Sequence, residues 1–241
     1  MNPLGFAVAA ALGNVVGALA VVRHERRSLL VIDACLAFGA GFMLAVALLG
    51  VMPEVLRDPA DAGDAAVFVL LGYLAVHLAQ HVLTPHFHFG EETHRVSATA
   101  GVSAMLGLTL HTFFDGVAIA SGFLVSGELG VLLFLAVLLH KLPEGVTIAS
   151  VMVAGGQSRG RALGAAAVLG IATVLGVVLT EQVGPLARHG LALSAGVTLY
   201  VAASNLVPQF QARRGWLTAL AFFGGAAGFF AAERLLEGWV R

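Results

Sequence analysis

The hydrophobic positions of this chain fall into eight long runs that are separated by short polar stretches. A helix needs roughly 20 residues to cross about 30 Å of hydrocarbon. The runs lie at about 4–22, 29–52, 65–84, 97–124, 128–154, 161–182, 190–210 and 215–236. The pattern therefore predicts an all-α polytopic membrane protein with eight transmembrane helices. Because little sequence lies outside the runs, we expect one transmembrane domain over residues 1–241, with a loop at about 84–96.

Composition agrees with this class. Hydrophobic residues make up 59% of the chain and charged residues only 11%, whereas soluble domains carry about 25% charged residues. We therefore expect the lipid bilayer to be the main environment of the chain. The formal net charge is −1 and no long basic run occurs, which argues against nucleic acid as a partner.

Arginine is distributed unevenly between the two ends of the predicted bundle. Eight arginines lie in or beside the loops that follow the first, third, fifth and seventh runs: Arg23, Arg26, Arg27, Arg95, Arg159, Arg161, Arg213 and Arg214. Four lie at the other end, near an acidic stretch: Arg57, Arg188, Arg234 and Arg241. Cytosolic loops carry the excess of basic residues. We therefore expect a multi-pass protein of the plasma (inner) membrane with both termini outside.

Two eleven-residue segments inside the fourth and fifth runs are near-copies of each other. They read His-Thr-Phe-Phe-Asp-Gly-Val-Ala-Ile-Ala-Ser from His111 and His-Lys-Leu-Pro-Glu-Gly-Val-Thr-Ile-Ala-Ser from His140. Each places a histidine four residues before a carboxylate, Asp115 in the first and Glu144 in the second. On a helix, such a pair shares one face, with about 6 Å between the two residues along the axis.

These pairs predict a divalent metal site near the middle of the membrane. An ionisable group in hydrocarbon costs about 2.5–3.5 kcal/mol on insertion scales, so it normally faces the bundle interior and marks an ion path. Imidazole and carboxylate suit Zn²⁺, Fe²⁺, Mn²⁺, Co²⁺ or Cd²⁺. Met43 in the second run is a candidate soft fifth ligand, with simple packing as its alternative. The alternative for the pairs is two buried histidines hydrogen-bonded to acids.

Proline and glycine near the motifs predict local irregularity. Pro143 lacks an N–H group and frees the carbonyl of Leu139, which predicts a kink that must face protein or a water-filled cavity. Gly116 and Gly145 follow the two carboxylates directly. We expect them to let the fourth and fifth spans approach closely.

A second, weaker repeat links the second and seventh runs. Residues 40–54 align without gaps with residues 195–209, and Pro53 matches Pro208. Since these two spans run in opposite directions, the alignment predicts that spans 1–3 and 6–8 form an inverted repeat around spans 4–5, a common plan in transporters. The alternative is a chance alignment of two apolar helices that contain glycine.

The paired motifs resemble those of the ZIP family of divalent metal transporters. That family carries His-Asn-x-x-Asp/Glu-Gly on its fourth span and His-x-x-Pro-Glu-Gly on its fifth. This chain has His111-Thr112-x-x-Asp115-Gly116 and His140-Lys141-x-Pro143-Glu144-Gly145. The resemblance implies eight spans, import towards the cytosol and frequent homodimers. It also implies a metal site shared by spans two, four, five and seven.

The departures from the family pattern predict a mononuclear site. Some members look binuclear, with a second metal held by the Asn after the first His, the residue after the second His and a Glu on span seven. This chain has Thr112, Lys141 and Asn205 at those positions. We expect the Lys141 ammonium to supply the charge of the missing metal and to lower the cost of burying the carboxylates. One metal would then be bound by His111, Asp115, His140 and Glu144.

Histidines near the cytosolic end of the third span suggest a further role. His77 and His81 form another pair four residues apart, and three more histidines follow in the loop: His86, His88 and His94. They are candidates for an exit relay or a low-affinity metal store. A solvated loop that binds metal incidentally is the alternative.

Taken together, these features predict transport of divalent transition-metal ions, most often zinc, rather than an enzyme. The metal would be the transported ion and not a cofactor. The competing hypothesis is an intramembrane zinc-dependent hydrolase, which uses bound zinc to activate water. The His-Glu-x-x-His spacing that is typical of many such enzymes does not occur in the chain.

Overall fold

The computed structural model describes residues 2–23, 29–81, 98–208 and 215–237. Every regular element in this part of the chain is a helix. The elements are α1 Pro3–Arg23, α2 Leu29–Ala45, η1 Val46–Val51, α3 Met52–Val55, α4 Ala62–His81, α5 Ala98–Val125, α6 Gly127–Ala154, α7 Arg159–Gln182, α8 Gly184–Tyr200, η2 Val201–Leu206 and α10 Trp216–Glu237. The all-α prediction is confirmed for the described residues.

Seven helices of the described part are long and apolar enough to cross a membrane. They correspond to the first six predicted spans and the eighth, so the chain is a polytopic membrane protein. The seventh predicted span corresponds to α8, which has 17 residues and continues without a break into η2. This helix begins at Gly184, earlier than the predicted residue 190, because Pro185 fits the first turn of a helix.

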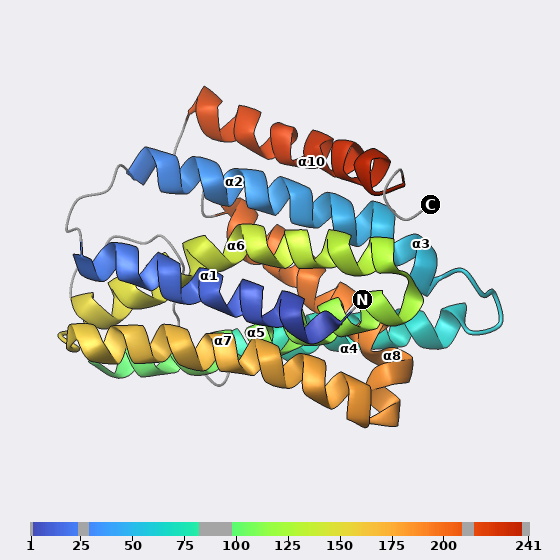
Figure 1. Ribbon diagram of the computed structural model, residues 1–241, viewed down its shortest axis with the longest axis horizontal. Coiled ribbons are helices and arrows are strands. Elements are labelled where there is room, and N and C mark those ends of the chain that lie inside the picture. The colour runs from blue at the N-terminus through green and yellow to red at the C-terminus, as the bar shows by residue number, and fades with distance from the viewer. Residues whose placement is uncertain (1, 24–28, 82–97, 209–214, 238–241) are drawn as a thin grey trace.

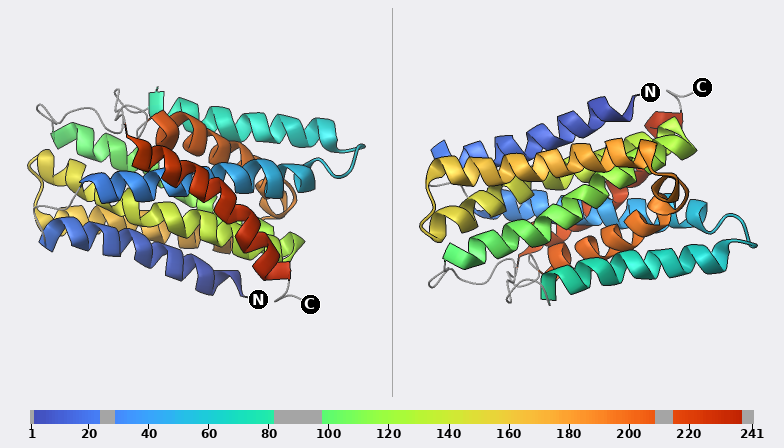
Figure 2. Two further views of the ribbon diagram at one scale, coloured as in Figure 1. Left: turned by 90° about the horizontal axis from the view of Figure 1, so that it is seen from above. Right: turned by 90° about the horizontal axis from the view of Figure 1, so that it is seen from below.

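The two helices with the repeated motifs lie inside the bundle. α6 contacts α1, α2 and α5, while α5 also contacts α7 and α8 (Figure 1). α4 and α10 pack on α8 and α2 respectively. The start of α1 and the end of α10 lie at the same end of the bundle (Figure 2). Large apolar side chains such as Leu12, Leu70, Ile171 and Phe223 are exposed, as expected for surfaces that face lipid.

Gly116 and Gly145 bring helices together, but not the pair that we expected. A Cβ atom on Gly145 of α6 would collide with the backbone carbonyl oxygen of Asn14 in α1. A Cβ atom on Gly116 of α5 would collide with the carbonyl oxygen of Thr173 in α7. The prediction that these glycines let spans four and five approach each other was therefore wrong. They instead hold each motif helix against a different outer helix.

Such contacts occur in matched pairs throughout the bundle. In each, a glycine meets a backbone carbonyl of the neighbouring helix, and a glycine at the corresponding position of another helix pair does the same. Besides the pair above, the matches are Gly17–Leu142 with Gly176–Phe113, Gly41–Phe222 with Gly196–Val69, and Gly72–Leu193 with Gly225–Phe38. The helix pair α1·α6 is thereby matched to α7·α5, and α2·α10 to α8·α4.

The two π-helical segments are matched as well. η1 spans Val46–Val51 and η2 spans Val201–Leu206, which are the same positions in the gap-free alignment of residues 40–54 with 195–209. Each segment ends two residues before a proline, Pro53 or Pro208. A proline leaves the carbonyl four residues before it without its usual partner, and π-turns often occur at functional sites. The alignment of the sequence paired the two prolines, but it did not predict π-helical turns before them.

Candidate metal centre

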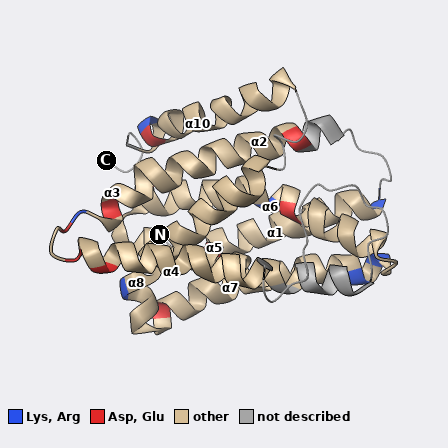
Figure 3. Cartoon of the chain, turned by 180° about the vertical axis from the view of Figure 1, so that it is seen from behind, with Lys and Arg blue, Asp and Glu red and all other residues tan. Residues whose placement is uncertain are grey.

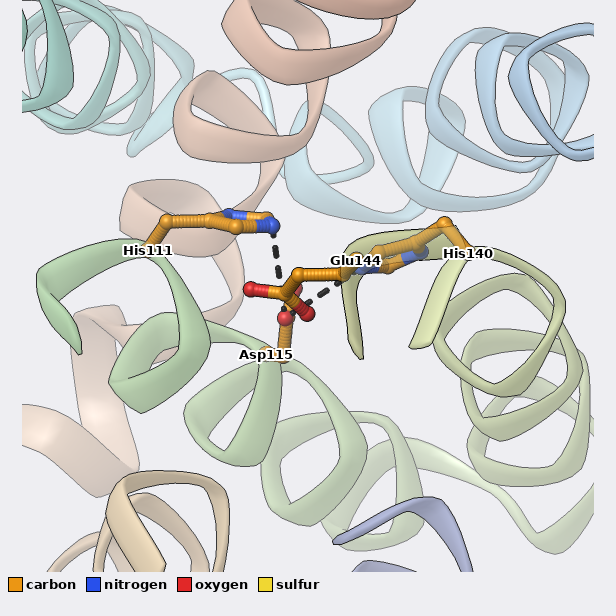
Figure 4. A group of neighbouring side chains, drawn as sticks. All are labelled: His111, Asp115, His140 and Glu144. Carbon is orange, nitrogen blue, oxygen red and sulfur yellow. Dashed lines mark hydrogen bonds and ion pairs between the residues drawn. The ribbon is translucent and has the colours of Figure 1, made fainter. Parts of the chain in front are cut away.

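Four side chains from the two central helices converge at one point. His111 and Asp115 come from α5, and His140 and Glu144 come from α6 (Figure 4). One ligand atom from each lies within 4.8 Å of the other three, and all four residues are buried. The structure thus brings together the four residues that the motifs single out.

Two distances inside this cluster match those between ligands of a tetrahedral metal ion. Asp115 Oδ2 lies 3.3 Å from His140 Nε2 and 3.5 Å from His111 Nε2. Bonds of about 2.0–2.2 Å to a tetrahedral Zn²⁺ place neighbouring ligand atoms about 3.3–3.5 Å apart. The two nitrogen–oxygen distances are therefore those expected between ligands of one ion.

The ring of His140 is oriented for coordination. Its Nδ1 lies 2.8 Å from the carbonyl oxygen of Ala136. A carbonyl only accepts, so Nδ1 carries the hydrogen and donates, which leaves Nε2 facing the cluster. Metal-binding histidines commonly donate their other N–H group to a backbone carbonyl in this way.

Lys141 joins the two carboxylates. Its side chain is fully buried, and Nζ donates to Asp115 Oδ2 and to Glu144 Oε2, each at 2.7 Å. A buried ion pair holds only where further contacts compensate for lost hydration, and here one ammonium serves two carboxylates. Glu144 Oε1 and His111 Nδ1 are buried and have no hydrogen-bond partner within the described residues.

The kink at Pro143 stays a prediction, but the backbone carbonyl that this proline frees lies inside the protein. α6 runs without interruption from Gly127 to Ala154 around this proline. The carbonyl oxygen of Leu139, which the proline frees, lies 3.5 Å from where a Cβ atom on Gly39 of α2 would stand. This agrees with the rule that unpaired backbone in a membrane faces protein.

A small cavity adjoins the cluster. Its lining is Leu36, Leu108, His111, His140, Pro143, Glu144, Thr147, Val201, Asn205 and Leu206. Leu108 precedes His111 along α5 and Thr147 follows Glu144 along α6, so the cavity extends towards the end of the bundle where α6 meets α7. On the opposite side of the cluster, Phe42, Leu132 and Phe229 belong to a buried apolar core.

The other proposed site residues of the transmembrane part lie in different environments. Met43 is buried among Val76, Val197 and Tyr200 and does not line the cavity, so its role as a ligand stays a prediction. Asn205 lines the cavity beside the cluster. The Thr112 hydroxyl donates to the carbonyl of its own helix at Thr109, 3.0 Å away.

The proposed relay is only partly covered by the structure. His77 is exposed on α4, and its ring meets the edge of the Tyr200 ring with centroids 5.8 Å apart. His81 ends α4, but its side chain lies outside the described part. The loop histidines also lie outside the described residues: His86, His88 and His94. The relay stays a prediction.

Asn14 of α1 is a neighbour of the cluster that sequence reasoning missed. It is fully buried. With its amide nitrogen facing the two acceptors beside it, Nδ2 lies 2.6 Å from the Lys141 carbonyl oxygen and 3.3 Å from Glu144 Oε2. The signal was present, because Asn14 is the single side chain with polar atoms between Pro3 and Val22. Its partner on another helix could not be read from the sequence.

Comparison with known proteins finds two similarities. The family model of the ZIP zinc transporters matches residues 86–233, which include both motifs. The chain is also similar to the zinc transporter ZupT of Enterobacter sp. (strain 638), with 30% identity over 223 residues. That match covers 86% of this chain and 85% of the relative.

Proposed function

Because this chain belongs to the ZIP family of zinc transporters, it transports divalent metal ions, and we propose that it carries zinc towards the cytosol through the His/carboxylate cluster. Family membership identifies a transporter and not an enzyme, which sets the hydrolase hypothesis aside. The observation that carries the proposal is the convergence of two imidazoles and two carboxylates within 4.8 Å inside the bundle.

The proposed site holds one ion bound by His111, Asp115, His140 and Glu144. The distances of 3.3 and 3.5 Å from Asp115 to the two imidazoles support a shared tetrahedral ion. The unpaired Glu144 Oε1 supports it too, since buried polar atoms normally have partners. Lys141 occupies the position between the carboxylates where a second ion would otherwise bridge them.

The direction of transport is proposed from charge and from the cavity. Acidic residues gather at the end of the bundle where α3 and the start of α4 lie, whereas basic residues occur at both ends (Figure 3). The excess of arginine in the sequence favours the end where α6 meets α7 as the cytosolic end, with both termini outside. The cavity extends from the cluster towards that end, which corresponds to a conformation ready to release metal inward.

Eight spans in an inverted repeat are the proposed architecture. The matched π-turns and the matched glycine contacts support an equivalence of α1, α2 and α4 with α7, α8 and α10. The start of α1 and the end of α10 lie at the same end of the bundle, which supports an even number of membrane crossings. The symmetry of the repeat then makes α5 and α6 equivalent, so that His111 corresponds to His140 and Asp115 to Glu144. A homodimer remains a proposal that rests on the family.

Metal uptake into vesicles that contain the purified protein tests the transport proposal. Zinc should accumulate only when the protein is present, and other divalent ions should compete. Anomalous scattering from metal-loaded crystals should place one ion between the four ligands. Uptake that is unchanged when the cluster is altered would contradict this route.

Replacing the loop histidines His86, His88 and His94 with serine is expected to reduce zinc uptake only modestly. A relay raises the local metal concentration but does not form the site at the middle of the membrane. The measurement is the initial rate of uptake at limiting zinc, compared with the unchanged protein at equal insertion. Complete loss of uptake would show that the loop is part of the essential path.

A further inference from the structure

The side-chain amide of Asn14 links the outer helix α1 to the proposed metal site. Its Nδ2 group donates to the Lys141 carbonyl oxygen at 2.6 Å and to Glu144 Oε2 at 3.3 Å. Both amide hydrogens therefore have acceptors, and Asn14 is 0% exposed. The contact of α1 with Gly145 is made by the Asn14 backbone, so the side chain is not needed for that approach.

These hydrogen bonds affect which oxygen of the Glu144 carboxylate is available to a metal ion. Oε2 accepts hydrogen bonds from Lys141 Nζ at 2.7 Å and from Asn14, whereas Oε1 has no partner in the described residues. Two donors from different helices on one oxygen restrict rotation of the carboxylate. We infer that Asn14 is a positioning residue that holds Glu144 as a ligand with one free oxygen. This inference rests on the proposed metal site.

A carboxylate held in this way favours small four-coordinate ions. Zinc accepts four ligands in a tetrahedron, whereas harder ions such as Mn²⁺ and Ca²⁺ prefer more oxygen ligands, including carboxylates that bind through both atoms. With Oε2 already occupied by two donors, Glu144 offers one oxygen only. Asn14 would thus contribute to selectivity without touching the ion.

Thr173 of α7 provides a natural comparison. It meets Gly116 of α5 as Asn14 meets Gly145 of α6. The Thr173 hydroxyl donates to the carbonyl of Leu169 in its own helix, 3.4 Å away. The two halves therefore share the backbone contact. In the described residues, Asn14 gives the carboxylate on α6 a hydrogen-bond donor from its outer helix, whereas the Thr173 hydroxyl bonds within its own helix.

Asn14→Thr tests the inference with little disturbance. A threonine hydroxyl at this position can donate to the carbonyl of Ala10 in its own helix, as Thr173 does to Leu169, so no buried donor is left unpaired. The variant is made in protein whose loop histidines are serine, which removes metal binding by the loop. We expect the Zn²⁺ dissociation constant to rise about 10- to 100-fold, the usual cost of losing a residue that orients a ligand. The visible spectrum of bound Co²⁺ should change from a tetrahedral to a higher-coordinate signature.

Thr173→Val is the matched control and should leave both the affinity and the cobalt spectrum unchanged. A wild-type affinity and spectrum in Asn14→Thr would overturn the inference. An equal loss in Thr173→Val would also overturn it, because general packing would then explain the effect. If Asn14→Thr does not give monodisperse protein, Asn14→Ser takes its place with the same expected results.

The same assay separates this inference from the proposed function. If Glu144→Ala binds cobalt as the parent protein does, the metal site itself is refuted. If Glu144→Ala loses binding while Asn14→Thr retains the parent affinity and spectrum, only the role of Asn14 is refuted.

Discussion

Replacing Glu144 with alanine is expected to reduce zinc uptake to the level of protein-free vesicles, and His140→Ala is expected to do the same. Each residue supplies one of four buried ligand atoms that lie within 4.8 Å of one another. A three-ligand site cannot compensate fully for the hydration that zinc loses when it enters the bundle, since desolvation of an ion is costly. The measurement is zinc uptake into vesicles with equal amounts of inserted protein.

Thr147→Val is the control for these two variants. Thr147 lines the same cavity, but its hydroxyl donates to the Pro143 carbonyl of its own helix at 2.9 Å. This variant should therefore retain uptake. Glu144→Gln keeps the shape of the side chain and removes its charge, so it should also abolish uptake if coordination is what matters. Wild-type transport by correctly inserted Glu144→Ala would contradict the proposed route.

The candidate site could be predicted from the sequence because two strong constraints act on it. Helical periodicity places His111 with Asp115, and His140 with Glu144, on one face of each helix. Hydrocarbon then forces these ionisable faces inward. Together the two constraints bring the four candidate ligands to the bundle interior, and neither constraint requires knowledge of which helices are neighbours.

The neighbours of the site could not be predicted, because they depend on which helices pack together. A glycine indicates that another helix approaches closely, but it does not indicate which helix. The sequence-based assignment of Gly116 and Gly145 to a contact between the fourth and fifth spans was therefore wrong. Asn14 belongs to no motif, and its contact with Glu144 exists only because α1 lies against α6. Likewise, Pro53 and Pro208 predict a lost hydrogen bond, but packing decides whether a kink or a π-turn results.

Lys141 sets the charge of the site. Asp115, Glu144 and the ammonium between them leave a single negative charge when both imidazoles are neutral, so an entering divalent ion meets less attraction than two carboxylates alone would give. A transporter must bind its ion and also release it. We therefore propose that the ammonium, at 2.7 Å from each carboxylate, stabilises the empty site and limits the affinity of the site for the metal ion.

The combined variant Thr112→Asn, Lys141→Asp, Asn205→Glu is expected to bind two metal ions at the middle of the membrane, where the unchanged protein binds one. It removes the ammonium from between Asp115 and Glu144 and adds oxygen ligands at the positions that hold a second metal in binuclear relatives. Thr112→Asn, Asn205→Glu with Lys141 kept is the matched control and should still bind one ion, because the ammonium occupies the bridging position and repels a second cation. Calorimetry or anomalous scattering in protein without loop histidines gives the stoichiometry. Two ions in the unchanged site, or two in the control that keeps Lys141, would show that the lysine does not take the place of a metal.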